Sequence, residues 1–265
     1  MKGYVYYTRA ESKRNQLFID DLIKEAKTIG IQLELLVDDE VPSAHTDFIL
    51  FRDRISEKSK SFEELGIKVF NRSEVIRIAN HKLRTFELAS LLGIPAVPTK
   101  RIQEVSEINE YPVVLKTVDG HGGNEVFLCS TDVQAEEFFA QFSESQLIVQ
   151  PFIESGARDV RVFVVGGDIV GAVKRTGNGS FKSNYTLGGS VERYELRNWQ
   201  IKEVQTLVKA IKSDYVGIDF LLLSDGRWLL NEIEDPVGAR SLYKTHDFSI
   251  ATKLMHYIKK QLLNE

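Results

Sequence analysis

Three acidic residues near the end of the chain are the clearest candidates for chemistry. Two apolar runs, residues 216–223 and 228–230, are separated by a Ser-Asp-Gly-Arg turn, a pattern that predicts a β-hairpin. Asp219 lies in the first predicted strand, and Glu232 and Glu234 end the second. Because side chains alternate along a strand, the two glutamates point the same way, and we expect Asp219 to face them.

Three converging carboxylates predict a metal site. Like charges that share a site cannot all stay ionised without a counter-charge. Magnesium prefers a few carboxylates together with substrate phosphates, so it would supply that charge. The alternative is a hairpin whose acids are solvated or paired with lysine or arginine. The apolar runs on both sides, which would bury the hairpin, favour the metal.

A second candidate site binds phosphate. Lys116 follows the apolar residues Val113-Val114-Leu115, so it projects from a largely buried strand, where an amine needs an anionic partner. Gly120, Gly122 and Gly123 follow. Glycine tolerates positive φ, and a loop of this kind can turn its N–H groups onto an anion. A nucleotide phosphate suits both features; the alternative is an ordinary flexible β-turn.

Further polar residues lie beside two other predicted strands. Gln150-Pro151-Phe152-Ile153 follows strand 147–149 and is expected to be an extended interdomain hinge whose backbone faces an adenine edge. Asp159 and Arg161 are two residues apart, and alternation places them on one face of a strand. Arg161 is suited to bidentate contact with a carboxylate or phosphate. The alternative is an exposed Asp159–Arg161 pair, which would contribute little to stability.

The elements that must position these residues fall into three predicted units. Residues 1–75 alternate short apolar strands with helix, which predicts a small βαβ layer with a parallel sheet. Residues 76–150 hold an interrupted helix, the buried lysine strand and its Gly-rich loop. Residues 151–265 are predicted as mostly antiparallel strands closed by helices near 200–212 and 249–263.

Composition excludes several classes of protein. The chain has 265 residues, 43% hydrophobic and 27% charged, which is typical of a folded protein with an ample core. A net charge of −4 gives no electrostatic case for nucleic acid or an anionic membrane as a partner. The single cysteine, Cys129, excludes an internal disulfide framework and a cysteine-based zinc site. No apolar window suits a signal or a membrane span, so we expect a cytoplasmic protein.

Together these segments resemble the ATP-grasp superfamily, and within it the branch similar to the RimK ribosomal-protein glutamate ligase and the carrier-protein ligases of lysine synthesis. The resemblance runs in family order from about Asn80 to the end of the chain, whereas residues 1–75 match only as a βαβ pre-ATP domain. The matching segments are 81–84, 93–95, 113–123, 150–153, 159–161, 181–184, 188–189, 217–219 and 231–234.

The resemblance implies an ATP-grasp fold of α/β (α+β) units, in which residues 76–150 form a lid and ATP lies between it and residues 151–265. It implies Mg²⁺, as two ions and replaceable by Mn²⁺, on Asp219, Glu232 and Glu234. The implied nucleotide-binding residues are Lys82, Lys116, Gly120, Gly122, Gly123, Gln150, Pro151, Phe152, Ile153, Asp159, Lys182, Ser183 and Asn184. The implied catalytic residues are Arg161 and Lys116, and the implied substrate residues are Arg161, Lys174, Asn184, Gly188, Gly189 and Arg240.

The function that the resemblance implies is an ATP- and Mg²⁺-dependent carboxylate–amine ligase, forming an amide or peptide bond through an acyl phosphate. An amino-acid or peptide substrate is expected, with Arg161 and Arg240 available for a second carboxylate, and related ligases are often homo-oligomers. The alternatives are crosslinking of a ribosomally made precursor peptide and ATP binding without catalysis; the complete acid set argues against the latter. Glu234 replaces the family's asparagine, and 235–241 replaces its Pro-Gly stretch, so substrate identity does not transfer.

Overall fold

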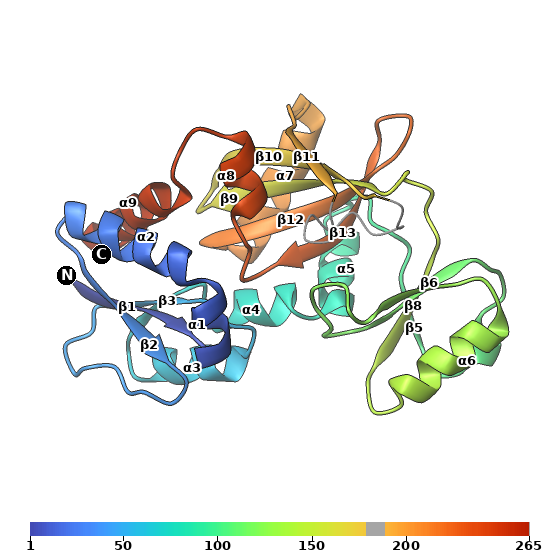
Figure 1. The fold of residues 1–265 in the computed structure, drawn as a ribbon, viewed down its shortest axis with the longest axis horizontal. Helices are drawn as coiled ribbons and strands as arrows, with labels where there is room; N and C mark the ends of the chain where they lie inside the picture. The colour runs from blue at the N-terminus through green and yellow to red at the C-terminus, as the bar shows by residue number, and fades with distance from the viewer. Residues whose placement is uncertain (179–188, 265) are drawn as a thin grey trace.

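The computed structural model describes residues 1–178 and 189–264, which form three sheets with helices packed on them (Figure 1). The first sheet has the order β2-β1-β3-β4 and is parallel throughout, as predicted for residues 1–75. Its strands are β1 (Lys2–Tyr7), β2 (Gln32–Val37), β3 (Phe48–Phe51) and β4 (Lys68–Phe70). The helices of this unit are α1 (Arg9–Arg14), α2 (Gln16–Thr28) and α3 (Ser56–Glu64).

The second unit begins with the predicted interrupted helix. Asn80 ends α4 (Ser73–Ala79), and His81 caps α5 (Lys82–Leu91) by accepting from the Arg84 N–H at 3.4 Å. An antiparallel sheet in the order β5-β8-β6-β7 follows, with α6 on it. Its elements are β5 (Lys100–Ile102), a 3₁₀ turn (Val105–Glu107), β6 (Val113–Thr117), β7 (Val126–Cys129), α6 (Asp132–Gln141) and β8 (Leu147–Pro151).

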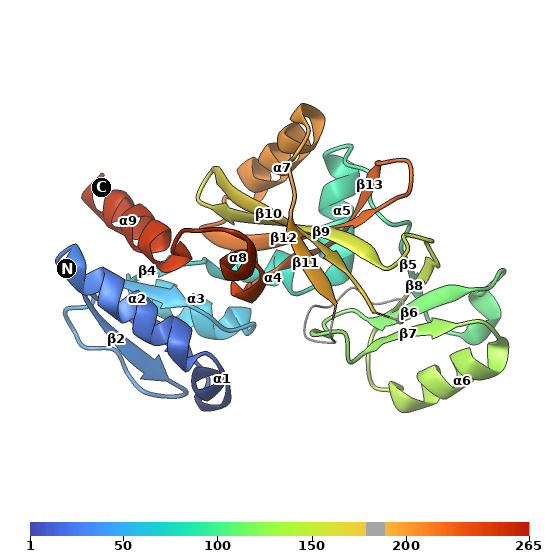
Figure 2. The same ribbon diagram turned by 45° about the horizontal axis from the view of Figure 1, so that its top comes forward.

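The third unit is an antiparallel sheet in the order β11-β10-β9-β12-β13, which lies between the other two units (Figure 2). Val160 and Val164 of β9 pack into an apolar core with Leu207 of α7. The alternate residues of β9, Asp159 and Arg161, therefore face the opposite side of the sheet. The elements are β9 (Arg158–Val165), β10 (Asp168–Thr176), β11 (Ser190–Arg193), α7 (Asn198–Ile211), β12 (Tyr215–Leu222), β13 (Trp228–Glu234) and α8 (Arg240–Thr245).

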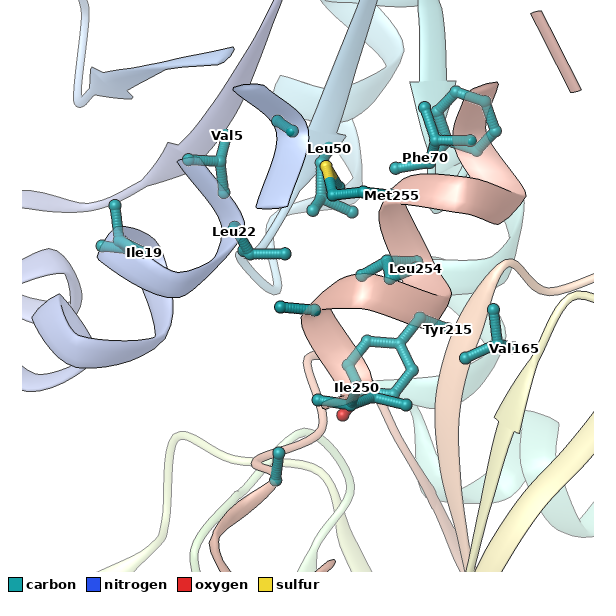
Figure 3. Close-up of a cluster of buried hydrophobic side chains, with 14 of the residues drawn as sticks. Val5, Ile19, Leu22, Leu50, Phe70, Val165, Tyr215, Ile250, Leu254 and Met255 are labelled. Carbon is teal, nitrogen blue, oxygen red and sulfur yellow. The ribbon is translucent and has the colours of Figure 1, made fainter. Parts of the chain in front are cut away.

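The C-terminal helix α9 (Ile250–Leu263) returns to the first unit. Its Leu254 and Met255 are fully buried in a core that includes Leu22 of α2 and Leu50 of β3 (Figure 3). Both ends of the chain consequently lie at this unit (Figure 1). The expected third unit, which includes this helix, is thus joined to the first by apolar packing. Among the helices of residues 1–178 and 189–264, none has the length and apolarity required to cross a bilayer.

Candidate active site

A cavity of about 600 Å³ lies where the three units meet. Its wall is formed by the end of the first sheet, by the Gly-rich loop and hinge of the second unit, and by one face of the third sheet. The predicted site residues that line it are Lys82, Lys116, Gly120, Gly122, Gly123, Gln150, Pro151, Phe152, Ile153, Asp159, Arg161, Glu232, Glu234 and Arg240. Residues from segments far apart in the chain are therefore gathered at one place.

The three acids converge as the hairpin pattern predicts. Asp219, Glu232 and Glu234 each offer a carboxylate oxygen, and these atoms lie within 4.8 Å of one another. In the register of the hairpin, Asp219 is opposite Glu232 and Gly217 is opposite Glu234. Asp219 is fully buried behind the cavity wall, whereas the two glutamates line the wall. Three carboxylate oxygens match the ligands that a hard dication takes, so the donor set fits Mg²⁺.

A β-bulge in β13 makes this convergence possible. Asp219 pairs with Glu232 but Phe220 pairs with Leu230, so Asn231 is an extra residue in its strand. Leu230 is buried in the core beneath α7, and strict alternation would turn Glu232 toward that core as well. The extra residue reverses the alternation and points the glutamates at the cavity. Asn231 itself lines the cavity.

Two buried arginines lie against the acids. Arg161 donates from Nε and Nη2 to both oxygens of Asp219, at 2.7 and 2.6 Å, and also pairs with Glu234. Arg175 donates to both oxygens of Asp159 and to Asp219, each at 2.6 Å. Burial alone would raise the pKa of Asp219, but the two guanidinium groups outweigh it and lower this pKa to about 2. Asp219 is therefore ionised although it is fully buried.

The alternative of an exposed Asp159–Arg161 pair is wrong. Both side chains are buried, and each binds a residue on a neighbouring strand. The register places Arg175 of β10 opposite Asp159 and Asp219 of β12 opposite Arg161. Arg175 is missing from the predicted site. The signal was available, because Val173 is a core residue and alternation places Arg175, two positions on, on the same face.

Besides Asp219, which is buried behind the wall, two predicted residues of the described part of the chain, Lys174 and Gly189, do not line the cavity. The expected placement of Lys174 needs correction: it lies on the face of β10 opposite to Arg175, and its Nζ donates to Glu192 at 2.6 Å. Gly189 packs on the backbone of Thr176, where a Cβ atom would come within 2.5 Å of the carbonyl oxygen. The predicted residues that lie outside the described part of the chain are Lys182, Ser183, Asn184 and Gly188.

The predicted phosphate site has two lysines at its centre. Lys116 is buried, and its Nζ donates to Asn231 Oδ1 at 3.0 Å. Burial lowers the pKa of Lys116 to about 8, with Glu232 opposing this change and Lys82 adding to it. Lys82, the first residue of α5, donates from Nζ to the carbonyl oxygen of Gly120. Both amines consequently lie beside the acids and the Gly-rich loop.

The Gly-rich loop has the backbone that its glycines allow. Gly122 and Gly123 have φ values of 68° and 79°, a region that other residues rarely enter. At the hinge, the buried side chain of Gln150 donates to Thr99 Oγ1 at 2.8 Å. Pro151 ends β8 and has no N–H group, so its backbone can offer only a carbonyl to a ligand.

The end of the cavity nearest the first unit contains residues that are not in the predicted site. Tyr7 is the last residue of β1, Arg52 and Arg54 follow β3, and Glu11 belongs to α1. Ligands of α/β sheets bind beyond the carboxyl ends of parallel strands, where these side chains lie. Two arginines directly after the apolar run Phe48–Phe51 were the available signal.

This arrangement of units around one cavity defines the chain as an ATP-grasp protein. The crystal structure of D-alanine–D-alanine ligase from Bacillus anthracis complexed with ATP matches 100% of this chain and 98% of that chain, with a TM-score of 0.79 and 16% identity. The ATP-grasp ligase PsnB, complexed with a minimal precursor, matches 98% of this chain and 100% of that chain, with a TM-score of 0.72 and 13% identity. The predicted ATP-grasp fold is confirmed.

The model of the RimK-like ATP-grasp domain matches residues 78–258, and the chain belongs to this family. A probable alpha-L-glutamate ligase from Shewanella sp. (strain MR-4) is 31% identical over 215 residues, which cover 77% of this chain and 71% of that protein. The predicted class, an ATP-dependent ligase of the ATP-grasp carboxylate–amine type, is confirmed.

Proposed function

We propose that this chain is an ATP- and Mg²⁺-dependent ligase that joins the carboxylate of an amino acid or peptide to an amine. The observation that carries the proposal is the convergence of Asp219, Glu232 and Glu234 at the wall of the cavity that Lys116 also lines. A protein that only bound ATP would have little use for two acids beyond Asp219.

In the proposed reaction, a substrate carboxylate takes up the terminal phosphoryl group of ATP, which gives an acyl phosphate and ADP. The lone pair of an amine then attacks the acyl carbon, phosphate leaves, and an amide remains once the amine has lost a proton. No covalent enzyme intermediate is required, so the protein acts by positioning groups and stabilising charge. Bound magnesium would supply positive charge to the phosphate oxygens.

In this proposal, the acids bind the metal and the lysines bind the phosphates. Asp219, Glu232 and Glu234 would hold magnesium, as one ion or two, and their oxygen ligands would also accept Mn²⁺. Lys116 and Lys82, which the structure places beside these acids, would bind the phosphates. Because both amines are buried, their attraction to phosphate is screened little by water.

The remaining predicted residues would position nucleotide and substrate. The hinge 150–153 would hold the adenine, and the loop 120–123 would cover the phosphates as part of a lid formed by residues 76–150. Asp159 would meet the ribose while it is paired to Arg175. Arg161 lines the cavity beside Glu234, where it would steady the charge of the acyl phosphate.

A peptide substrate is the second candidate. PsnB, which has the same fold, was solved with a minimal precursor. The cavity of this chain is also bordered by Leu17, which is 88% exposed, and by Tyr243, which is 39% exposed. Exposed apolar side chains at the border of a site favour contact with more than a single small molecule.

The proposal is tested by a phosphate-release screen with paired carboxylic and amino compounds, including short peptides, read by mass spectrometry. We expect one pair to give ADP, phosphate and an amide product in the presence of Mg²⁺. Lys116→Met should lower this turnover by about a hundredfold or more, whereas Lys209→Met, at an exposed position of α7, should leave it unchanged. Turnover that is indifferent to Lys116→Met would remove this lysine from the phosphate site.

A further inference from the structure

We propose that Asn71, a residue of the first unit, is a positioning residue for the metal site of the third unit. Asn71 directly follows β4, is buried and does not line the cavity, so it would act on a bound ion only through other residues. It acts through the hairpin that carries Asp219, Glu232 and Glu234. The inference rests on the proposed function, because that function places magnesium on these three acids.

The side-chain amide of Asn71 uses both of its polar groups on the third unit. Its Oδ1 accepts from the backbone N–H groups of Asp214 and Tyr215, at 2.5 and 3.0 Å. Its Nδ2 donates to the carbonyl oxygen of Tyr215 at 2.7 Å and to Asp235 Oδ1 at 3.1 Å. Because the two backbone N–H groups can bond only to the carbonyl oxygen of the amide, its orientation is fixed.

These four hydrogen bonds hold both strands of the hairpin. Tyr215 is the first residue of β12, and Asp219 lies four residues farther along the same strand. Asp235 directly follows β13, which ends at Glu234. One side chain of the first unit therefore holds the beginning of the strand that carries the first acid and the end of the strand that carries the other two.

The segment that follows Glu234 is held at two further points. The buried Arg52 of the first unit donates from Nη2 to the carbonyl oxygen of Val237 at 2.6 Å. Val237 is fully buried and packs on Gly217, where a Cβ atom would come within 2.5 Å of Val237 Cγ2. Gly217 is the residue opposite Glu234 in the hairpin. The chain after Glu234 thus folds back over the strand position that pairs with this acid, and the first unit anchors it there.

The relative position of the acids matters because Mg²⁺ demands near-ideal octahedral geometry. Groups that hold metal ligands in place from outside the coordination shell contribute to affinity, and the loss of one typically weakens metal binding by about tenfold to a hundredfold. Asn71 holds the main chain on both sides of the acids. We therefore expect the first unit to set how tightly the third unit binds the metal.

The alternative is that Asn71 only joins two units. Thr252 provides the comparison, because its Oγ1 donates to Glu25 Oε2 at 2.8 Å and so joins α9 to α2 of the first unit. Neither of these two residues lines the cavity or belongs to the hairpin. A contact that merely joins units should affect stability but not the affinity for metal.

The inference is tested on the whole protein with Mn²⁺ and a non-hydrolysable ATP analogue, without a carboxylate or amine substrate. Electron paramagnetic resonance measures the free Mn²⁺. Asn71→Ala should raise the dissociation constant of Mn²⁺ by about tenfold or more. This substitution removes no charge, so a lost electrostatic attraction would not account for weaker binding. Thr252→Val is the control and should leave the constant unchanged.

A pair of substitutions at Asp235 decides the question if Asn71→Ala does not fold. Asp235→Ala and Asp235→Asn remove the same charge, but only asparagine keeps an oxygen that can accept from Asn71 Nδ2. We expect the Asp235→Ala protein to bind Mn²⁺ about tenfold more weakly than the Asp235→Asn protein. Equal affinities of the two proteins would overturn the positioning role.

The role of Asn71 would also be overturned if Asn71→Ala left the Mn²⁺ affinity unchanged, if Thr252→Val lowered it as much, or if the unmodified protein bound no Mn²⁺. Failure of the ligase proposal gives a different result. If Asn71→Ala weakens Mn²⁺ binding but no pair of compounds stimulates phosphate release, the ligase proposal fails while the positioning role stands. Turnover by a protein whose Mn²⁺ affinity ignores Asn71 gives the reverse result.

Discussion

Lys116 donates a 3.0 Å hydrogen bond to Asn231 across the cavity. The lysine belongs to β6 of the second unit and the asparagine to the bulge of β13 in the third, so the bond joins two units. Burial disfavours the charged form of the lysine and lowers its pKa to about 8. The amide oxygen offsets part of this cost and holds the amine beside the acids.

Asn231→Ala should therefore lower the free energy of unfolding by about 1–3 kcal/mol, because it leaves a buried ammonium group without its acceptor. In a protein that already carries Lys116→Met, Asn231→Ala should lower the free energy of unfolding by much less. Urea unfolding of the four proteins gives the coupling energy directly. If the effects of the two substitutions on the free energy of unfolding were simply additive, the hydrogen bond would contribute nothing to stability.

Most of the fold was predictable because its signals are local. Apolar runs predicted the strands of the hairpin, and Asn80 marked a real break between two helices. The destination of α9 was not predictable in this way. Its apolar face, which includes Leu254, would suit any buried surface, and only the folded chain shows that the first sheet provides it.

The site was predictable in its residue types and less so in its geometry. The convergence of Asp219 and Glu232 depends on a β-bulge, and no residue spacing in the sequence predicted this bulge. Likewise, the partner of Asp159 is set by the register of β10, which places Arg175 opposite it. Strand register is a long-range property, so the pattern within one strand does not determine it.

Glu234→Asn tests the departure from the family pattern. Amide oxygen can replace carboxylate oxygen as a ligand, so turnover should persist. The concentration of Mg²⁺ needed for half-maximal phosphate release should rise several-fold, because one negative charge is lost from the set. A magnesium titration of turnover measures this. Complete loss of activity would mean that the carboxylate has a task beyond metal binding, such as holding Arg161.

Arg175→Met tests the buried ion pairs. The substitution leaves Asp159 without its bidentate partner and removes one of the two arginines that bind Asp219. Breaking a buried pair from one side typically costs about 3–5 kcal/mol, because the remaining charge stays buried. Urea unfolding should show a loss of this size. Lys174→Met, next in sequence but half-exposed on the other face, should change stability by less than about 1 kcal/mol; equal losses would refute the assignment of the two faces.

Asp214 should make the stability of the protein depend on pH. Burial raises its pKa from 3.8 to about 6, although the Tyr257 hydroxyl, which donates to it at 2.7 Å, opposes this change. The folded state therefore holds the proton more tightly than the unfolded chain. The stabilisation of the folded state by this protonated carboxyl group is fully present below about pH 4, and it is lost as the pH rises through 6. The difference corresponds to roughly 3 kcal/mol of unfolding free energy.

Asp214→Asn removes this titration while keeping an oxygen that can accept from Tyr257. We expect the unfolding free energy of the unmodified protein to fall, relative to that of the variant, between pH 4 and pH 6 and then to level off. Urea unfolding at several pH values in this range measures the difference. Two parallel curves would show that the carboxyl group ionises as easily in the folded protein as in the unfolded chain, despite its burial directly before β12.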